Sequence, residues 1–157
     1  MKNRTYRYFQ GEALYPFGYG LGYTKFAFDR IRVSSTAVSA GEGVTVTATV
    51  RNAGDVAGIC TVQAYLADLE ASVAVPCRSL AGMKPVELLP GESRDVSFVL
   101  SARQMAAVGE DGRFTVEPGA FRISIGSSQP DARSLFLTGE NVVSAEFTVT
   151  GTVTLPV

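Results

Sequence analysis

The chain has 157 residues, with 14 basic and 15 acidic side chains and neither histidine nor tryptophan. One domain is expected, because a chain of about 150 residues buries roughly 70% of its unfolded surface and so supplies its own core. The net charge of -1 provides no basic field for nucleic acid, and no apolar run approaches the roughly 20 residues of a membrane span. Without imidazole, Ser/His/Asp and Cys/His catalysis and most zinc sites are excluded, and no metal or cofactor is expected.

Residues 1–24 are predicted to form an extended aromatic segment ahead of a β domain that covers residues 25–157. The run LYPFGYGLGYTKF (Leu14–Phe26) contains five aromatic rings and three glycines. Glycine lets the backbone approach a neighbouring surface closely, and tyrosine supplies apolar area with a polar tip. The pattern indicates an interdomain docking segment, whose candidate residues are Tyr15, Phe17, Gly18, Tyr19, Gly20, Leu21 and Tyr23.

Two other interpretations of this segment stay open. Because a large exposed apolar patch is unusual in a monomer, the segment is expected either to fold back over the domain or to be buried by another copy of the chain, which would make a homo-oligomer. Alternatively, Tyr15, Tyr19 and Tyr23 could stack on a glycan, although the absence of tryptophan weakens that hypothesis. A phosphate-binding glycine loop is not expected at Gly18–Gly22, because no apolar strand precedes it and no helix follows it.

The first half of the β domain shows the alternation typical of half-buried strands. A first strand is predicted within Lys25–Ser35, with a bulge where the parity of the apolar residues changes between Phe28 and Ile31. Valine and alanine alternate with threonine over Val44–Val50, which is the clearest strand. The next strand, Ile59–Leu66, places Cys60, Val62, Ala64 and Leu66 on its more apolar face.

The second half continues in the same way. Val73–Leu89 predicts one or two strands broken by Gly82 and Pro85, and Pro90-Gly91 predicts a type II turn. Further strands are predicted at Val96–Leu100, Phe121–Ile125 and Val142–Thr150, with their alternate residues in the core. Ser101–Val108 is the only helix predicted, beginning at Ser101 and ending at Gly109. These elements indicate an all-β, antiparallel sandwich of about seven strands, with a closed barrel as the alternative.

The residues that could carry chemistry have simpler explanations. Cys60 and Cys77 could form a disulfide if their strands form a hairpin, or each could be a small buried hydrophobe. The close carboxylates, Asp68 with Glu70 and Glu110 with Asp111, fall on polar loop tips, where they are expected to be solvated. No catalytic residue is therefore assigned to this chain.

Taken in order, short motifs along residues 4–150 resemble the C-terminal fibronectin type III-like domain of family 3 glycoside hydrolases, the β-glucosidase and β-xylosidase group. The family pattern YPFGYGLSYT resembles the stretch after Leu14, and V-x-N-x-G, L-x-P-G-E and V-E-P-G-x-F follow. The matching residues are Arg4–Phe9, Leu14–Phe26, Val50, Asn52, Gly54, Gly58, Val62, Gln63, Tyr65, Pro76, Leu80, Gly82, Leu88, Pro90, Gly91, Glu92, Val116–Gly119, Phe121 and Gly126–Ser128. Departures occur at Gly22, Ile59, Cys60, Met83 and Phe114, none of which removes a catalytic group.

The resemblance implies an immunoglobulin- or fibronectin type III-like sandwich and a division of labour. In the family, two preceding domains supply the catalytic carboxylates, and the sandwich packs against them. The chain is therefore expected to be the end of a longer protein, often secreted or periplasmic, with no hydrolase activity of its own. Its expected partners are the catalytic domains of the parent glycosidase. The alternative is a free-standing module that binds carbohydrate or a cell surface.

Overall fold

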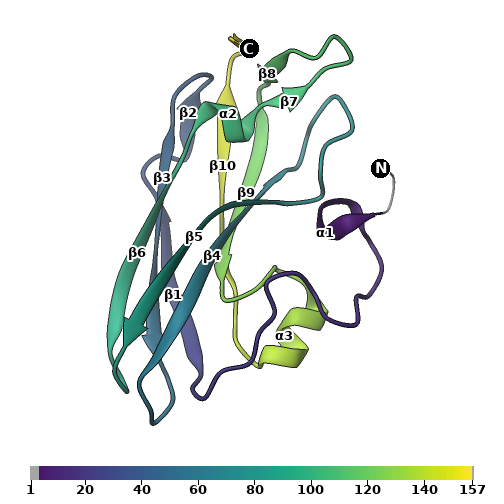
Figure 1. The fold of residues 1–157 in the computed structure, drawn as a ribbon. Coiled ribbons are helices and arrows are strands. Elements are labelled where there is room, and N and C mark those ends of the chain that lie inside the picture. Colours follow the sequence, from purple (N-terminus) through teal and green to yellow (C-terminus); the bar gives the residue numbers. More distant parts are fainter. Residues whose placement is uncertain (1–3, 157) are drawn as a thin grey trace.

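The computed structural model describes residues 4–156, which form a β-sandwich with three short helices (Figure 1). Seven of its strands have eight or more residues, which confirms the predicted all-β fold. The strands are β1 (Phe26–Val33), β2 (Ala37–Ser39), β3 (Val44–Asn52), β4 (Gly58–Asp68), β5 (Ser79–Leu88), β6 (Ser93–Leu100), β7 (Ala107–Val108), β8 (Phe114–Val116), β9 (Gly119–Gly126), β10 (Val143–Thr150) and β11 (Val153–Leu155).

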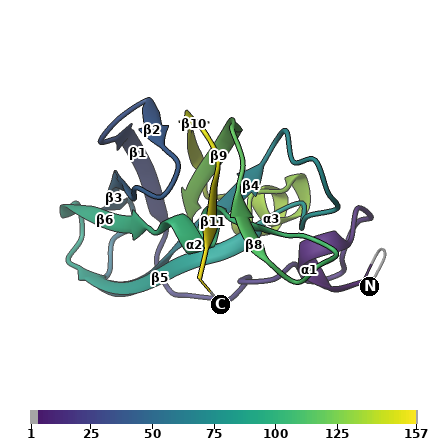
Figure 2. The same cartoon turned by 90° about the horizontal axis from the view of Figure 1, so that it is seen from above.

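Two sheets make the sandwich. One has three strands in the order β1-β3-β6, and the other has five in the order β2-β10-β9-β4-β5. Neighbouring strands run antiparallel except for β2, which lies parallel to β10. A small sheet, β11-β8-β7, lies at the end of the sandwich where the described chain finishes, as Figure 2 shows from above. The main sheets are separate, so the architecture is a sandwich rather than a closed barrel.

The core lies between the two main sheets and comes from the predicted strands. Val44, Val62, Leu100 and Ile123 are completely buried, and the rings of Phe121 and Phe147 stack with their centroids 5.7 Å apart. Each such side chain stabilises the fold by about 1.5–3 kcal/mol relative to an exposed position. The predicted alternation is therefore the pattern that places these side chains between the sheets.

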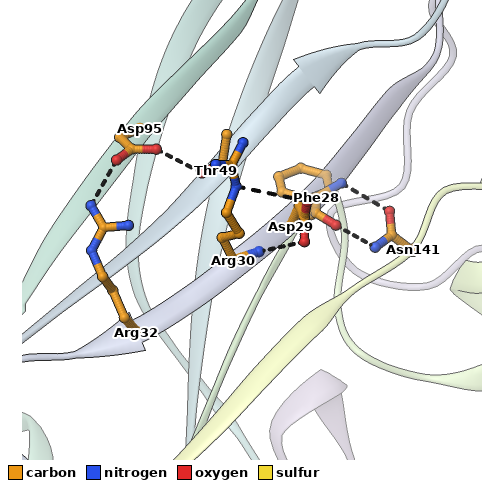
Figure 3. A network of polar contacts seen from close by, with 7 residues as sticks. All are labelled: Phe28, Asp29, Arg30, Arg32, Thr49, Asp95 and Asn141. Atoms are coloured by element: carbon orange, nitrogen blue, oxygen red, sulfur yellow. Dashed lines mark hydrogen bonds and ion pairs between the residues drawn. The ribbon is translucent and has the colours of Figure 1, made fainter.

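The predicted bulge in β1 is present. The register of β1 against β3 shifts between Asp29 and Arg32, and Arg30 takes a positive φ of 49°. The Arg30 backbone N–H donates to Asp29 Oδ1 at 2.7 Å, as shown in Figure 3. Beyond the bulge, Arg32 reaches Asp95 on β6 at 2.7 Å. The extra residue turns Arg32 to the outer face, where it links the two outer strands of this sheet.

The prediction that Gly82 and Pro85 break the chain into shorter strands is wrong, because β5 runs through both. β5 is the edge strand of the five-stranded sheet, where the missing N–H of proline needs no partner. A Cβ at Gly82 would lie 2.8 Å from the ring of Phe98, so glycine is required there for close packing. The Pro90-Gly91 turn is confirmed by a positive φ of 75° at Gly91 and by the bond from Glu92 N–H to Leu89 O at 3.0 Å.

The helices differ most from the sequence-based expectation. The predicted helix is α2 (Ala102–Met105), which is shorter than expected because the chain becomes extended at Ala106. Two more helices, α1 (Thr5–Tyr8) and α3 (Ala132–Thr138), were not predicted. Among residues 4–156, no helix is long and apolar enough to cross a bilayer.

Candidate docking surface

The outer face of β4 is buried by the aromatic segment. Cys60, Val62, Ala64 and Leu66 face the core as predicted, so Gln63 and Tyr65 point to the opposite side of the sheet. Yet Gln63 is only 7% exposed and Tyr65 only 1% exposed. A strand with a solvated outer face would leave both side chains in water. The chain ahead of β1 covers them instead.

Hydrogen bonds from Gln63 hold the segment in place. The Tyr65 hydroxyl donates to Gln63 Oε1 at 2.5 Å, which turns the Gln63 amide nitrogen toward two carbonyl oxygens. Gln63 Nε2 donates to Gly18 O at 3.3 Å and to Ser127 O at 2.8 Å. Gln63 therefore joins the segment, β4 and the loop after β9.

Gly18 is the point of closest approach. Its φ is +82°, a value that favours glycine. A Cβ there would collide with Gln63 Oε1 and would lie 2.9 Å from the Tyr65 hydroxyl oxygen. The neighbouring Phe17 O accepts from the Gln129 backbone N–H at 3.3 Å. These contacts explain why the segment needs a glycine at position 18, whereas a Cβ at Gly20 would meet nothing within 4 Å.

A second anchor comes from α1, which the sequence did not predict. The ring of Tyr6 stacks on Phe17 with centroids 4.1 Å apart and meets Tyr65 edge-on at 6.4 Å. The Tyr6 hydroxyl accepts from the Leu80 N–H at 3.2 Å, and Arg7 O accepts from the Cys77 N–H at 2.7 Å. The sequence contains aromatic residues before Leu14, but a helix of four residues is too short to show a helical periodicity.

The remaining predicted docking residues face outward. Leu21 is 91% exposed, Tyr23 is fully exposed, and Leu14 and Tyr15 are largely exposed. Tyr15 stacks on Tyr19 with centroids 5.8 Å apart, which leaves Tyr19 partly buried. The segment thus folds back over the sandwich with its backbone, with the buried Pro16 and with one face of Phe17, whose ring stacks on Tyr6 but is still 43% exposed. Its other large side chains contact solvent.

A hollow of about 240 Å³ lies beneath the segment, and Cys60 is one of the residues that line it. Gly18–Gly22, Gln63 and Glu140 are among its other lining residues. Burial and, to a smaller extent, the nearby Glu140 carboxylate together raise the pKa of the Cys60 thiol to about 12. The thiol stays protonated near neutral pH, so it is not a nucleophile.

The disulfide considered for Cys60 and Cys77 is not formed. Both are free thiols, Cys60 buried and Cys77 exposed. β4, which contains Cys60, does form a hairpin with β5, but the register puts Val86 opposite Cys60. Cys77 precedes Ser79, which pairs with Leu66 at the other end of β4. The hairpin therefore separates the two sulfurs along its length.

A larger hollow of about 360 Å³ lies beside α2 and is lined by Asp68, Arg103 and Phe114, among others. Burial raises the pKa of Asp68, although its bond from the Glu70 N–H acts in the opposite direction. The Arg103 guanidinium covers the Phe114 ring at 3.9 Å. That contact occupies one face of the ring on which a sugar could stack. Among the described residues, no group of three or more Cys, Asp or Glu side chains could hold a metal ion.

Comparisons with known proteins identify this architecture. A fibronectin type III-like domain family matches residues 60–129. A β-xylosidase from Formosa agariphila is 38% identical over 85% of this chain and 19% of its own length. The thermostable β-glucosidase B of Acetivibrio thermocellus is 40% identical over 80% of this chain and 17% of its own length. A solved β-glucosidase from Erythrobacter marinus superposes with a TM-score of 0.78 at 32% identity, over 92% of this chain and 18% of that one.

The chain is a fibronectin type III-like domain of family 3 glycoside hydrolases. It spans less than a fifth of the length of these relatives. Domains of this type are non-catalytic modules of their enzymes. The family match begins at Cys60 and ends at Gln129, so both the aromatic segment and α3 lie outside it.

Proposed function

We propose that this domain is an accessory module that packs against and stabilises the catalytic domains of a family 3 β-glycosidase. One observation carries the proposal: Gln63 and Gln129 fix the backbone of the aromatic segment, while Leu21 and Tyr23 point into solvent. In the isolated domain Leu21 and Tyr23 contact water, so they contribute no hydrophobic burial energy to its stability. A partner that covers them gains about 1.5–3 kcal/mol for each large side chain.

The parent enzyme is proposed to hydrolyse β-glucosides or β-xylosides, because the relatives are β-glucosidases and β-xylosidases. The carboxylates of a retaining glycosidase stand about 5–5.5 Å apart across the sugar, one of them with a raised pKa. Asp111 is instead exposed and bridged to Arg113 at 3.5 Å, and hydrogen bonds lower the pKa of Glu117. The catalytic pair is therefore assigned to the parent's other domains.

The test is a double substitution, Leu21→Ser with Tyr23→Ser, in the full-length glycosidase that carries this domain. The half-life of activity at an elevated temperature should fall by about tenfold or more, corresponding to about 1.4 kcal/mol, while kcat/KM before heating stays unchanged. Val99→Ser is the matched control, because Val99 is an exposed apolar residue on β6 of the opposite sheet. Equal half-lives for the double variant and wild type would contradict the proposal.

Carbohydrate binding is the competing function, and the stacked Tyr15–Tyr19 pair is its best support. Titration of the 157-residue chain with soluble β-glucan distinguishes the two functions. We expect no saturable binding, because each ring of the pair already has one face against the other. Saturable binding that is lost in Tyr19→Ala would favour the carbohydrate-binding module instead.

A further inference from the structure

Helix α3 has an inverted distribution of polar and apolar residues. Its fully buried side is polar, with Ser134 at 0% and Thr138 at 9% exposure, whereas Phe136 is 78% and Leu135 41% exposed. Ala132 is exposed as well, so the outward residues occupy positions i, i+3 and i+4 of one helical face. A surface helix of a free-standing domain normally presents its apolar stripe to the core. α3 presents its stripe to solvent.

Burying the polar side of α3 lowers the stability of a domain that folds alone. The Thr138 hydroxyl donates to Ser134 O at 2.9 Å, but the buried Ser134 Oγ has no hydrogen-bond partner. A buried hydroxyl without a partner destabilises the folded state. Contacts with the chain ahead of β1 fix this orientation, and an external surface that covers Leu135 and Phe136 would add the burial energy that these solvent-facing side chains lack.

α3 is held rigidly in this orientation. Asp131 caps the start by accepting from the Ser134 N–H at 2.7 Å, and Gly139 closes the end with a φ of 65°. The helix and the loop before it are connected to the chain ahead of β1 at three places. Lys25 Nζ donates to Thr138 O, the Gln129 N–H donates to Phe17 O, and Arg133 lies 3.7 Å from Glu12.

These contacts connect α3 to the segment, so the exposed side chains of both belong to one continuous surface region. Leu137 of α3 lines the same hollow as Gly20 and Leu21, and Figure 1 shows the segment passing beside α3. Leu137 thus brings α3 next to Leu21, and a partner that covers the outer side of the segment would lie beside this helix. In the relatives, more than four fifths of the polypeptide lies beyond the matched part, so a large covering partner is available within the same protein.

We propose that α3 is the second half of the docking surface, with Leu135 and Phe136 inserted into an apolar groove of the parent's catalytic region. The inference rests on the proposed function and extends it to a helix outside the matched family range. The mode is that of a short helix laid into a groove, with Leu135 and Phe136 as adjacent anchors and Ala132 one turn earlier on the same face. A second copy of the chain is the other occupant that the experiment distinguishes.

Hydrogen exchange of the 157-residue chain and of the full-length glycosidase tests the inference. The amides of residues 132–138 should exchange at least tenfold more slowly in the full-length protein, while those of α2 exchange equally in both. If residues 14–23 become protected but α3 does not, the inference is wrong and the proposed function stands. If neither is protected, both are wrong. Protection of α3 that appears in the isolated chain as its concentration rises would overturn the proposed occupant in favour of a second copy.

Phe136→Ser adds a readout that a purely structural role would not produce. In the isolated chain the substitution should leave the Tm nearly unchanged, because the ring is 78% exposed and its one described ring contact, with the Arg133 guanidinium at 5.6 Å, is long. In the full-length enzyme it should shorten the half-life at elevated temperature by about tenfold, whereas the Val99→Ser control leaves it unchanged. A lower Tm in the isolated chain, or an unchanged half-life in the full-length enzyme, overturns the inference.

Discussion

Gly18 is the residue whose identity the docking segment depends on most directly. Gly18→Ala should lower the free energy of unfolding of the isolated chain by about 1–2 kcal/mol, because alanine is strained at a positive φ and its Cβ collides with Gln63 Oε1. Gly20→Ala is the matched control, since a Cβ there meets nothing within 4 Å. Urea denaturation measures both variants. Equal stability of the two would show that the Gly18 contact is not formed.

Asp95 gives the fold a pH-dependent contribution. Hydrogen bonds from Thr49 and then from Arg32 lower the pKa of Asp95 below its ordinary value of 3.8. Because the folded-state pKa is the lower one, this stabilisation is present above about pH 4 and is lost as the pH falls through the folded value.

Thr49→Val removes the hydrogen bond that lowers the pKa of Asp95 most, and it keeps a β-branched side chain in β3. NMR titration of the Asp95 carboxyl should show its pKa rising toward 3.8 in the variant. Thr47→Val is the control, because the Thr47 hydroxyl pairs with Ser97 at 2.7 Å and not with Asp95. A pKa of Asp95 that does not change in Thr49→Val would show that the Thr49–Asp95 bond is absent in solution.

The two thiols should differ sharply in reactivity. One thiol per folded chain, that of the exposed Cys77, should react with a thiol reagent at pH 8, because Cys60 is buried and its pKa is raised to about 12. The second thiol should react only after denaturation, and Cys77→Ser should remove the fast reaction. A chain that shows no thiol even when denatured would contain the disulfide that the structure lacks.

At the scale of elements, the capping residues of α3 are the feature of the sequence that indicates this helix. Asp131 and Gly139 stand eight positions apart at either end of ARSLFLT, in the positions that favour a helix N-cap and a left-handed C-cap. Leu135 and Phe136 between them face solvent. The apolar periodicity that usually reveals the buried face of a helix is therefore missing here. Caps alone could have predicted the helix. Its orientation could not be predicted, because it depends on contacts with the aromatic segment.

Asp131→Ala should destabilise the isolated chain by about 1 kcal/mol and speed hydrogen exchange in α3, because the N-cap acceptor is lost. Asp131 also lies 3.5 Å from Arg78, so Asp131→Asn serves as the control. Asparagine keeps the cap and removes the negative charge. Chemical denaturation should show most of the loss in the alanine variant only. An equal loss in both variants would assign the effect to the contacts of Asp131 Oδ2 with Arg78 and Gln129 instead.

At the scale of the whole molecule, alternation along the chain was enough to predict the sandwich and its core. The apolar faces of β3, β4, β6, β9 and β10 lie where the period of two placed them. The packing of the aromatic segment on the outer face of β4 was less predictable. Gln63 and Tyr65 have the alternation of solvated residues, and their burial results from a segment about 45 positions away in the sequence. The glycine and aromatic pattern predicted a docking role for that segment, but not which side chains face inward.

The two faces of the segment now have separate roles. Phe17 and Gly18 attach it to the sandwich, and Leu21 and Tyr23 remain available to a partner. Attachment before assembly reduces the conformational entropy that is lost when the partner binds. The domain is therefore expected to act as a preorganised brace rather than as a flexible linker.

Calorimetric titration of the 157-residue chain into the parent glycosidase from which this domain has been deleted tests the central claim most directly. The account predicts saturable one-to-one binding with a negative heat-capacity change, because apolar surface is buried. Leu21→Ser with Tyr23→Ser should weaken the binding by at least tenfold. Absence of binding by the wild-type chain, with both proteins folded, would contradict the claim that this domain docks on the catalytic region.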